Sequence, residues 1–282
     1  MILRIDGIPL HVVREGSGPV CVLSAGLGMC WFDWDPVVPL LTPYRTVVRF
    51  DRPGLRLSAP ATTPPTLLAE AHRIRSVLDA LALTGPCTVV GHSLAAFHAE
   101  AFARLHPGRT TGVVLVDGSD AIRRKPPPAP CLRIAAAQAL ADVLTASAVP
   151  YLLGPAARRL VWRASSLSAR DPAPPALVRR CYRTGRGLRA ALQENVRHGD
   201  VAAELCALRS RAPLPPVPVT VLAAYDASGS ARSRRSLERQ RALADTLGAA
   251  FRVAAPAGHM VMTDSPGDLA SAILATVPAA SR

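Results

Sequence analysis

This chain of 282 residues has no long apolar run, few aromatic residues, a single lysine and no CxxC cysteine pairs. A bilayer-spanning helix needs roughly 20 consecutive apolar residues, so no such helix is expected. The stretch from Met1 to Asp6 is strand-like and lacks the charged and apolar regions of a secretion signal, which predicts a cytoplasmic protein. The six scattered cysteines have no histidines at zinc spacing, which predicts free thiols and no metal site.

The low aromatic content of 4% and the absence of a nucleic-acid motif argue against a nucleic-acid binder. The net charge of +13 is concentrated in one segment: residues 121–212 contain 16 basic residues and only five acidic ones. This segment could attract an anionic small-molecule substrate or make weak contact with an anionic membrane surface. The alternative is a solvated surface whose arginines reflect compositional bias.

Short apolar segments alternate with helical patterns along most of the chain. Residues 2–16 predict two strands joined at Asp6-Gly7, and helices are expected at 66–83, 94–105, 237–247 and from Pro266. The segments expected to form buried strands are Val20–Ser24, Thr46–Phe50, Cys87–Val90, Val113–Val116, Val219–Ala224 and Phe251–Ala255. This order predicts an α/β fold with a mostly parallel, doubly wound sheet and an antiparallel start.

Residues 119–217 interrupt the alternation with helix-like sequence rich in alanine, arginine and leucine. Proline clusters at 126–130 and 213–218 bracket the segment, and such clusters act as stiff connectors. We therefore predict an α/β core formed by residues 1–120 and 213–282, with a helical, arginine-rich lid at 121–212.

Ser93 is the candidate nucleophile, in the sequence Gly91-His-Ser-Leu-Ala95 between an apolar strand and a helix. A serine on such a sharp turn is held exposed above the sheet, and small neighbours let strand and helix approach each other. Gly91 is one small neighbour, and Ala95 stands at the second small position. The Leu94 N–H at the helix N-terminus is expected to point towards the reacting atoms.

A serine hydroxyl needs a base, and a base needs an orienting acid. His259, directly after the last expected strand, is the best base, and the other six histidines are expected to pack or face solvent. Asp226, which follows the strand Val219–Ala224, is the preferred acid because it lies between serine and histidine in chain order. Asp117, at the end of the strand Val113–Val116, is the alternative acid.

A tetrahedral oxyanion needs a second N–H donor besides Leu94. The turn Ser24-Ala-Gly-Leu-Gly28 follows a buried strand, and Leu27 is its most suitable donor. A glycine-rich turn without a catalytic role is the alternative.

The chain resembles the α/β-hydrolase superfamily, in its lidded lipase, esterase and peroxidase-like branch. The resemblance rests on Ser24–Gly28 with Trp31, on Asp51–Ser58, on Gly91–Ala95, on Tyr225-Asp226 and on Gly258-His259, and it covers residues 1–120 and 213–282. It implies an eight-stranded sheet with helices on both faces, and an acyl-enzyme mechanism without metal or organic cofactor. Departures are Ala25-Gly26 in place of the family's frequent His-Gly, and Ala95 in place of glycine.

These features predict a serine hydrolase acting on a carboxylic ester, either anionic or hydrophobic. A thioesterase or C–C bond hydrolase would use the same triad. Epoxide hydrolase and dehalogenase chemistry is disfavoured, since those branches place a carboxylate where Ser93 stands. A non-catalytic receptor that kept only the pocket is a further alternative, because fold alone does not determine function. The sequence does not indicate an oligomeric state.

Overall fold

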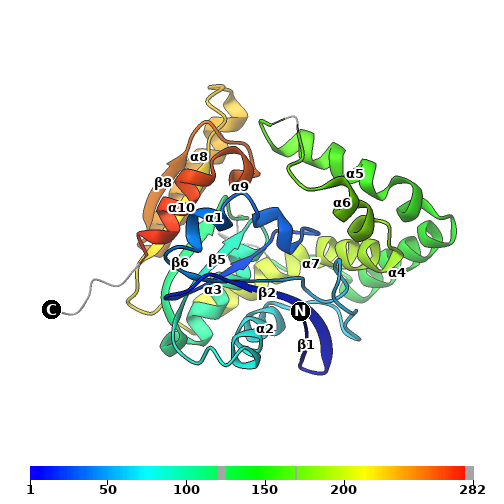
Figure 1. The fold of residues 1–282 in the computed structure, drawn as a ribbon, viewed down its shortest axis with the longest axis horizontal. Helices are drawn as coiled ribbons and strands as arrows, with labels where there is room; N and C mark the ends of the chain where they lie inside the picture. The colour runs from blue at the N-terminus through cyan, green and yellow to red at the C-terminus, as the bar shows by residue number, and fades with distance from the viewer. Residues whose placement is uncertain (120–124, 169, 277–282) are drawn as a thin grey trace.

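The computed structural model describes residues 1–119, 125–168 and 170–276, and a sheet of eight strands forms its centre (Figure 1). The strand order is β1-β2-β4-β3-β5-β6-β7-β8. β1 and β2 pair antiparallel with their neighbours and all other pairs are parallel, which confirms the predicted sheet. The strands are Ile2–Ile5 (β1), Ile8–Glu15 (β2), Val20–Ser24 (β3), Thr46–Phe50 (β4), Cys87–His92 (β5), Thr110–Val116 (β6), Val219–Ala224 (β7) and Ala250–Ala254 (β8).

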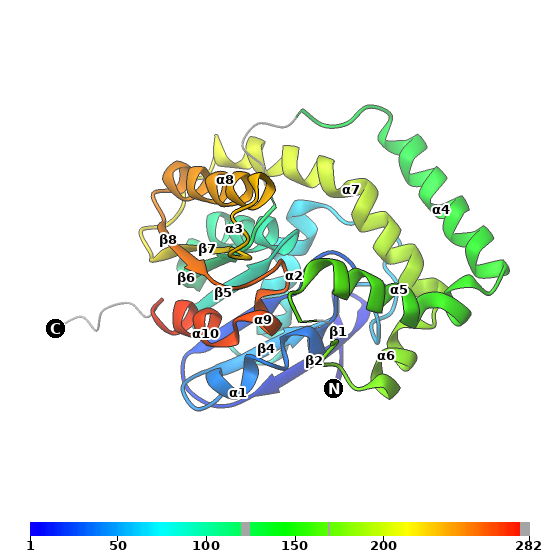
Figure 2. The ribbon, with the colours of Figure 1, turned by 90° about the horizontal axis from the view of Figure 1, so that it is seen from above.

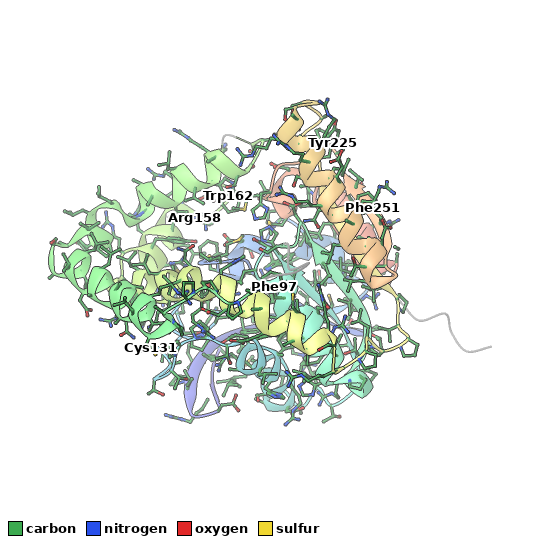
Figure 3. The ribbon with its side chains drawn as sticks, turned by 180° about the vertical axis from the view of Figure 1, so that it is seen from behind. Phe97, Cys131, Arg158, Trp162, Tyr225 and Phe251 are labelled. Carbon is green, nitrogen blue, oxygen red and sulfur yellow. The ribbon has the colours of Figure 1, made fainter. Side chains whose placement is uncertain are left out.

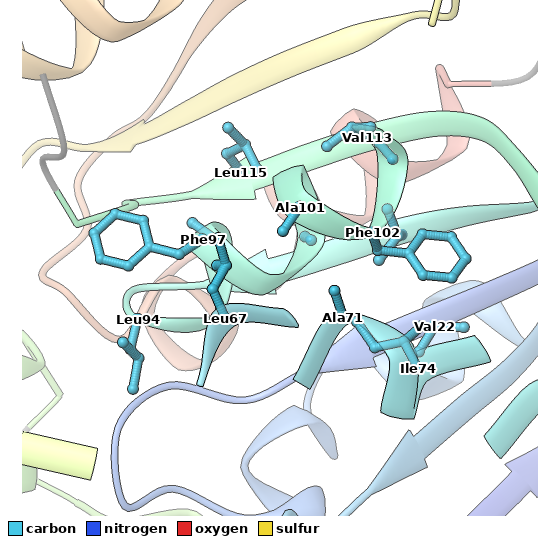
Figure 4. Packing of buried hydrophobic residues seen from close by; sticks show 14 of the residues in the cluster. Val22, Leu67, Ala71, Ile74, Leu94, Phe97, Ala101, Phe102, Val113 and Leu115 are labelled. Carbon is cyan, nitrogen blue, oxygen red and sulfur yellow. The ribbon is translucent and has the colours of Figure 1, made fainter. Parts of the chain in front are cut away.

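The central strands are continuously apolar because both faces of the sheet are buried. Along β6, Val113 and Leu115 join one hydrophobic cluster, whereas Val114 and Val116 join a second cluster on the other face. Successive side chains of a strand point to opposite faces, so a run without polar residues supplies both clusters. Figure 4 shows the first cluster, in which Phe97 and Phe102 of a neighbouring helix pack against the sheet.

Helices cover both faces of the sheet (Figure 2). One face is covered by Leu67–Ala80 (α2), Ala95–Leu105 (α3) and Ala231–Leu247 (α8), and the other by Val38–Leu41 (α1), Val261–Asp264 (α9) and Pro266–Leu274 (α10). α8 begins six residues before the predicted Leu237, because the Ser230 hydroxyl caps the helix by accepting the Ser233 N–H at 3.1 Å. The short helices α1 and α9 carry too little periodicity to be predicted.

Between β6 and β7, the described residues form four helices, in the segment where the sequence predicts a helical insertion. They are Pro130–Ala146 (α4), Val149–Ser165 (α5), Pro175–Tyr182 (α6) and Gly185–Arg209 (α7). α4 packs along α7 at the outer edge of the molecule (Figure 2), and Arg209 of α7 binds Glu100 of α3 at 2.7 Å. We refer to α4–α7 as the helical insertion; its role as a lid stays a prediction.

The inner side of α5 carries a buried arginine. Arg158 pairs with Asp33 of the sheet domain at 2.7 Å and with Asp171 of the insertion at 2.7 Å. Arg158 and its neighbour Trp162 lie where α5 meets the rest of the molecule (Figure 3), and both side chains are buried. Breaking one partner of such a buried pair leaves an uncompensated charge, so these contacts hold the insertion against the sheet domain.

No single helix in the described part of the chain is long and apolar enough to cross a membrane. α4 and α5 together meet the length and hydropathy criteria as a pair, with a bend of 107° between them.

Candidate active site

Ser93 lies at the turn between β5 and α3 with a backbone φ of +54°. A non-glycine residue at positive φ is strained, and such strain is concentrated at functional turns. Gly91 makes the turn feasible, because a Cβ at this position would lie 2.1 Å from the carbonyl oxygen of Ala95. The methyl group of Ala95 itself is fully buried without displacing the strand. The alanine at this position is therefore compatible with the sharp strand–turn–helix geometry.

His259 follows β8 and is positioned by two contacts. Its Nδ1 lies 2.5 Å from Oδ2 of Asp117, and its carbonyl oxygen lies 2.8 Å from Nε2 of His92. His92 is completely buried, and this burial lowers the pKa of its imidazole well below the usual value. A neutral His92 can donate its Nε2–H to the His259 carbonyl, so the residue beside Ser93 positions the backbone of the candidate base.

The sequence-based preference for Asp226 as the partner of His259 is wrong in this structure. The Asp226 carboxylate accepts hydrogen bonds from the hydroxyls of Ser233 at 2.6 Å and Ser228 at 2.8 Å. The Ser233 hydroxyl in particular lowers the pKa of Asp226, whose side chain is only partly buried. Asp226 thus closes a turn that leads into α8, two residues beyond the end of β7, and does not reach His259.

Asp117, the alternative acid, is the residue that meets His259. It follows β6 immediately, with φ +41°, and its second carboxylate oxygen accepts the Ala224 N–H at 3.2 Å. Its own N–H donates to the Leu222 carbonyl at 2.8 Å, which extends the pairing of β6 with β7. Both the backbone and the side chain of Asp117 are therefore fixed by β7, with one oxygen left to orient the imidazole.

Ser93 and His259 line one cavity of about 510 Å³ between the sheet domain and the helical insertion. The rest of the lining is mostly apolar and includes Leu27, Met29, Leu144, Leu153, Val161, Trp162, Leu188 and Met260. Within the described part of the chain, no hydrogen bond joins the Ser93 hydroxyl to His259. Such contacts are often long without substrate and tighten when it binds, so the shared cavity is compatible with a serine–histidine pair.

The expected oxyanion donors, Leu27 and Leu94, stand at the ends of β3 and β5, which are neighbours in the sheet. Among the described residues neither N–H has a hydrogen-bond acceptor. Leu27 lines the cavity with Ser93, and Leu94 is the residue at which α3 begins. The two N–H groups are thus available to a ligand, as an oxyanion site requires.

Two charged residues that the sequence analysis missed hold the backbone of the Leu27 turn. Arg52 donates to the carbonyl oxygens of Ala25 and Gly26, the latter at 2.7 Å, and Glu194 of α7 accepts the Gly28 N–H at 2.8 Å. Arg52 and Glu194 also bind each other at 2.6 and 2.9 Å. We call this pair the loop clamp. Its sequence signal was weak, because Glu194 is one of three acidic residues in a helix rich in arginine and no local pattern distinguishes it from Asp200 and Glu204.

Both side chains of the loop clamp are buried, and the negative charge of Glu194 compensates the positive charge of Arg52. Burial lowers the pKa of Arg52, but the Glu194 carboxylate more than offsets this effect and raises the pKa above its usual value. Arg56 adds a third contact by donating to the Gly28 carbonyl, with its guanidinium stacked 3.5 Å from the centre of the Tyr182 ring. Arg56 is itself held at a strained φ of +42°. The segment Asp51–Ser58, on which the family resemblance partly rests, therefore supports the Leu27 turn directly.

All six cysteines are free thiols, as the sequence predicts. Burial raises the pKa of the Cys30 thiol well above its usual value and that of Cys87 to about 12, so neither forms a reactive thiolate at neutral pH. In the ranges that the structure describes, no group of three or more histidine, cysteine or acidic side chains is arranged to hold a metal ion.

The fold and the site together identify the class of protein to which this chain belongs. An eight-stranded, mostly parallel sheet presents a strained serine after β5, a carboxylate after β6 and a histidine after β8. This is the α/β-hydrolase architecture. The chain belongs to the alpha/beta hydrolase family, whose sequence model matches residues 21–272.

Two curated relatives match parts of the chain. RutD of Caulobacter sp. strain K31, named for a proposed carbamate hydrolase activity, is 35% identical over 118 residues, which are 40% of this chain and 43% of RutD. Polyketide synthase ThaQ of Burkholderia thailandensis is 32% identical over 117 residues, which are 42% of this chain and 6% of ThaQ. The chain therefore spans less than half the length of either relative.

Solved structures match almost the whole chain. Cfl2 of Burkholderia cenocepacia has a TM-score of 0.77 at 20% identity and covers 98% of this chain and 95% of its own. A thermophilic esterase of Thermogutta terrifontis has a TM-score of 0.71 at 21% identity, with 98% and 96% covered. The enol-lactonase of Burkholderia xenovorans LB400 has a TM-score of 0.66 at 22% identity, with 98% and 99% covered. At these identities the likeness shows the fold alone.

Proposed function

We propose that this protein is a serine hydrolase that cleaves a carboxylic ester or a related acyl bond. The observation that supports the proposal most is the 2.5 Å contact between Asp117 and His259 beside the strained Ser93 in one cavity. A carboxylate on Nδ1 keeps the imidazole in the tautomer whose Nε2 can accept a proton, and it stabilises the imidazolium that then forms.

The reaction proceeds in two acyl-transfer steps. The Ser93 oxygen attacks the substrate carbonyl while its proton passes to His259, and the oxyanion is stabilised by the Leu27 and Leu94 N–H groups. His259 then protonates the leaving group as the carbonyl re-forms. Water, deprotonated by His259, then attacks the acyl ester on Ser93. The acid is released as the bond to the Ser93 oxygen breaks and His259 returns the proton to that oxygen. No metal or organic cofactor takes part in this scheme.

The cavity favours an apolar acyl group. Its lining is mostly aliphatic and aromatic, and the charge of Arg158 is already paired with Asp33 and Asp171. The other arginine of the lining, Arg56, donates to the carbonyl oxygens of Gly28 and Cys181 and stacks on the Tyr182 ring. A hydrophobic ester is therefore a better substrate than an anionic one. The carbamate hydrolase name of RutD and the esterase and lactonase names of the structural neighbours agree with acyl-bond hydrolysis in general. Epoxide opening stays disfavoured because a serine, and not a carboxylate, stands at the turn.

Labelling with a fluorophosphonate probe tests the proposed nucleophile. Wild-type protein is expected to be labelled and to hydrolyse p-nitrophenyl esters, with a preference for chains that fill the cavity, whereas Ser93→Ala is expected to lose both. Ser165→Ala is the matched control because Ser165 lines the same cavity and has no triad partner, so it should retain labelling. Absence of labelling in folded wild-type protein would favour a binding function for the cavity.

A further inference from the structure

Exposed apolar side chains are concentrated on two adjacent helices of the insertion. Eight of the fifteen large apolar side chains that are exposed among the described residues belong to α4 and α5. Leu132 of α4 and Leu160 of α5 are the most exposed of them, each with 70% of its surface exposed. Single exposed apolar residues are ordinary, but a contiguous group on one element indicates a surface that is covered in use.

On α5 these residues form a helical face with three parallel rows. Leu152, Ala156 and Leu160 recur every four residues and form an exposed apolar row. On one side of it, Leu153, Ala157 and Val161 form the row that lines the candidate catalytic cavity. On the other side lie Arg159 and Arg163, one helical turn apart and exposed. We call these three rows the α5 face.

The arginine row has no carboxylate partner in the part of the chain that the structure describes. Arg159, Arg163 and Arg170 line a cleft of about 240 Å³, and none of them forms an ion pair with a residue that the structure describes. The one acidic residue in the cleft, Asp171, is already bound by Arg158 at 2.7 Å. The cleft therefore presents uncompensated positive charge directly beside the exposed apolar row.

A second copy of this chain does not fit the α5 face. Docking two such faces would bring the unpaired arginines of both copies together, and residues 121–212 as a whole contain 16 basic residues against five acidic ones. An anionic lipid surface matches both features at once, because its head groups accept arginines while the layer beneath accepts leucine side chains. α5 would lie along such a surface and would not cross it, because Arg158 and Trp162 on its inner side are buried against the sheet domain.

We propose that the α5 face docks the protein onto anionic lipid surfaces, with Leu152 and Leu160 inserted among the lipids and Arg159 and Arg163 at the head groups. Because the cavity-lining row is next to the inserted row, docking turns the mouth of the cavity towards the lipid. A hydrophobic ester dissolved in the lipid would then reach Ser93 without crossing water. The docking itself does not depend on the proposed hydrolysis.

Vesicle co-sedimentation tests the docking separately from catalysis, with Ser93→Ala as the parent protein. It is expected to sediment with vesicles of equimolar phosphatidylglycerol and phosphatidylcholine, to remain in solution with phosphatidylcholine alone, and to be released by high salt. Arg159→Gln combined with Arg163→Gln should lower the partition coefficient roughly tenfold or more, since each arginine at an anionic surface contributes substantially to binding. Leu152→Ser combined with Leu160→Ser should produce a loss of similar size.

Matched controls use exposed residues of the same types on other helices. Leu40→Ser with Leu68→Ser on α1 and α2, and Arg235→Gln with Arg239→Gln on α8, should bind vesicles as the parent does. Equal binding by the α5-face variants and the parent, or no binding by the parent, would overturn the proposal. Concentration-dependent dimers of the parent that disappear in Leu152→Ser/Leu160→Ser would also overturn it, in favour of an interface between copies.

Discussion

At the scale of single residues, the number of residues between the end of a strand and the following aspartate decides whether its carboxylate can contact His259. Asp117 follows the last residue of β6 directly, and β7 holds both its backbone and one of its oxygens. Asp226 stands two residues beyond β7, where the chain has already turned and nearby serine hydroxyls satisfy its carboxylate. Both positions agree with the chain order of a triad, so only the geometry distinguishes them.

Replacing Asp117 and Asp226 separately by asparagine tests which of the two carboxylates orients His259. Asp117→Asn should lower kcat by roughly 10⁴-fold, because an amide favours the wrong tautomer of the histidine it contacts. Asp226→Asn should leave kcat/KM of a p-nitrophenyl ester unchanged, although it weakens the turn before α8. Steady-state kinetics of the two variants decide the assignment. The reverse pattern, with activity lost only in Asp226→Asn, would exclude Asp117 as the orienting acid.

At the scale of elements, the helical insertion contributes to the site through α7. Glu194 of this helix binds the Gly28 N–H and completes the loop clamp with Arg52. The clamp fixes the backbone on both sides of Leu27, the expected oxyanion donor. Donors of this kind act only when they are held in place before the charge develops. The insertion is therefore coupled to the Leu27 turn as well as to the cavity wall.

The variant Glu194→Gln tests this coupling. It should lower kcat roughly tenfold, a fraction of the effect of removing an oxyanion donor outright, while KM changes little. It should also cost about 3 kcal/mol of unfolding free energy, because Arg52 is left buried without its carboxylate. Kinetics and urea unfolding measure the two effects.

The control for this variant is Glu204→Gln on the same helix. Glu204 binds the Leu67 N–H and Arg197, and it makes no contact with the Leu27 turn. The control should lower stability without lowering kcat. If both variants lost the same fraction of kcat, the loop clamp would have no specific role in positioning the turn.

At the scale of the whole molecule, two clusters on opposite faces of the sheet enclose groups that resist protonation. Burial lowers the pKa of His92 and of His98 well below the usual value of 6.5. Above pH 6.5 these histidines are neutral in both the folded and the unfolded chain and do not affect stability. Below it, the unfolded chain binds protons that the folded chain does not, so stability decreases as the pH falls.

Burial also lowers the pKa of His106, to about 4. The free energy of unfolding should therefore decrease below about pH 6.5 by up to about 1.4 kcal/mol per pH unit for each of His92, His98 and His106. Urea unfolding at a series of pH values measures this slope. His98→Gln, which removes one of these three groups, should reduce the slope by the contribution of one proton, up to about 1.4 kcal/mol per pH unit. A stability that stays constant between pH 7.5 and pH 5 would contradict the assignment of these histidines as buried and neutral.

Much of the fold could be predicted from sequence because its physical signals are local. Three strands, Val20–Ser24, Thr46–Phe50 and Val219–Ala224, have the predicted bounds, since short apolar runs of β-branched residues suit a strand buried on both faces. The turn at Ser93 was also visible, because a close approach of strand and helix requires a residue as small as Gly91. The short helices α1 and α9 depend on contacts with neighbouring elements and gave no such signal.

The sequence by itself determined the parallel sheet, the strained Ser93 and the position of His259 after the last strand, because each follows from periodicity or from steric limits within a few residues. Only the tertiary structure decided which aspartate meets His259 and which charges hold the Leu27 turn. Asp117 and His259 are 142 residues apart in the chain, and Gly28 and Glu194 are 166 apart. Contacts at such separations depend on the direction in which each strand end and helix presents its side chains, and no local pattern encodes that direction.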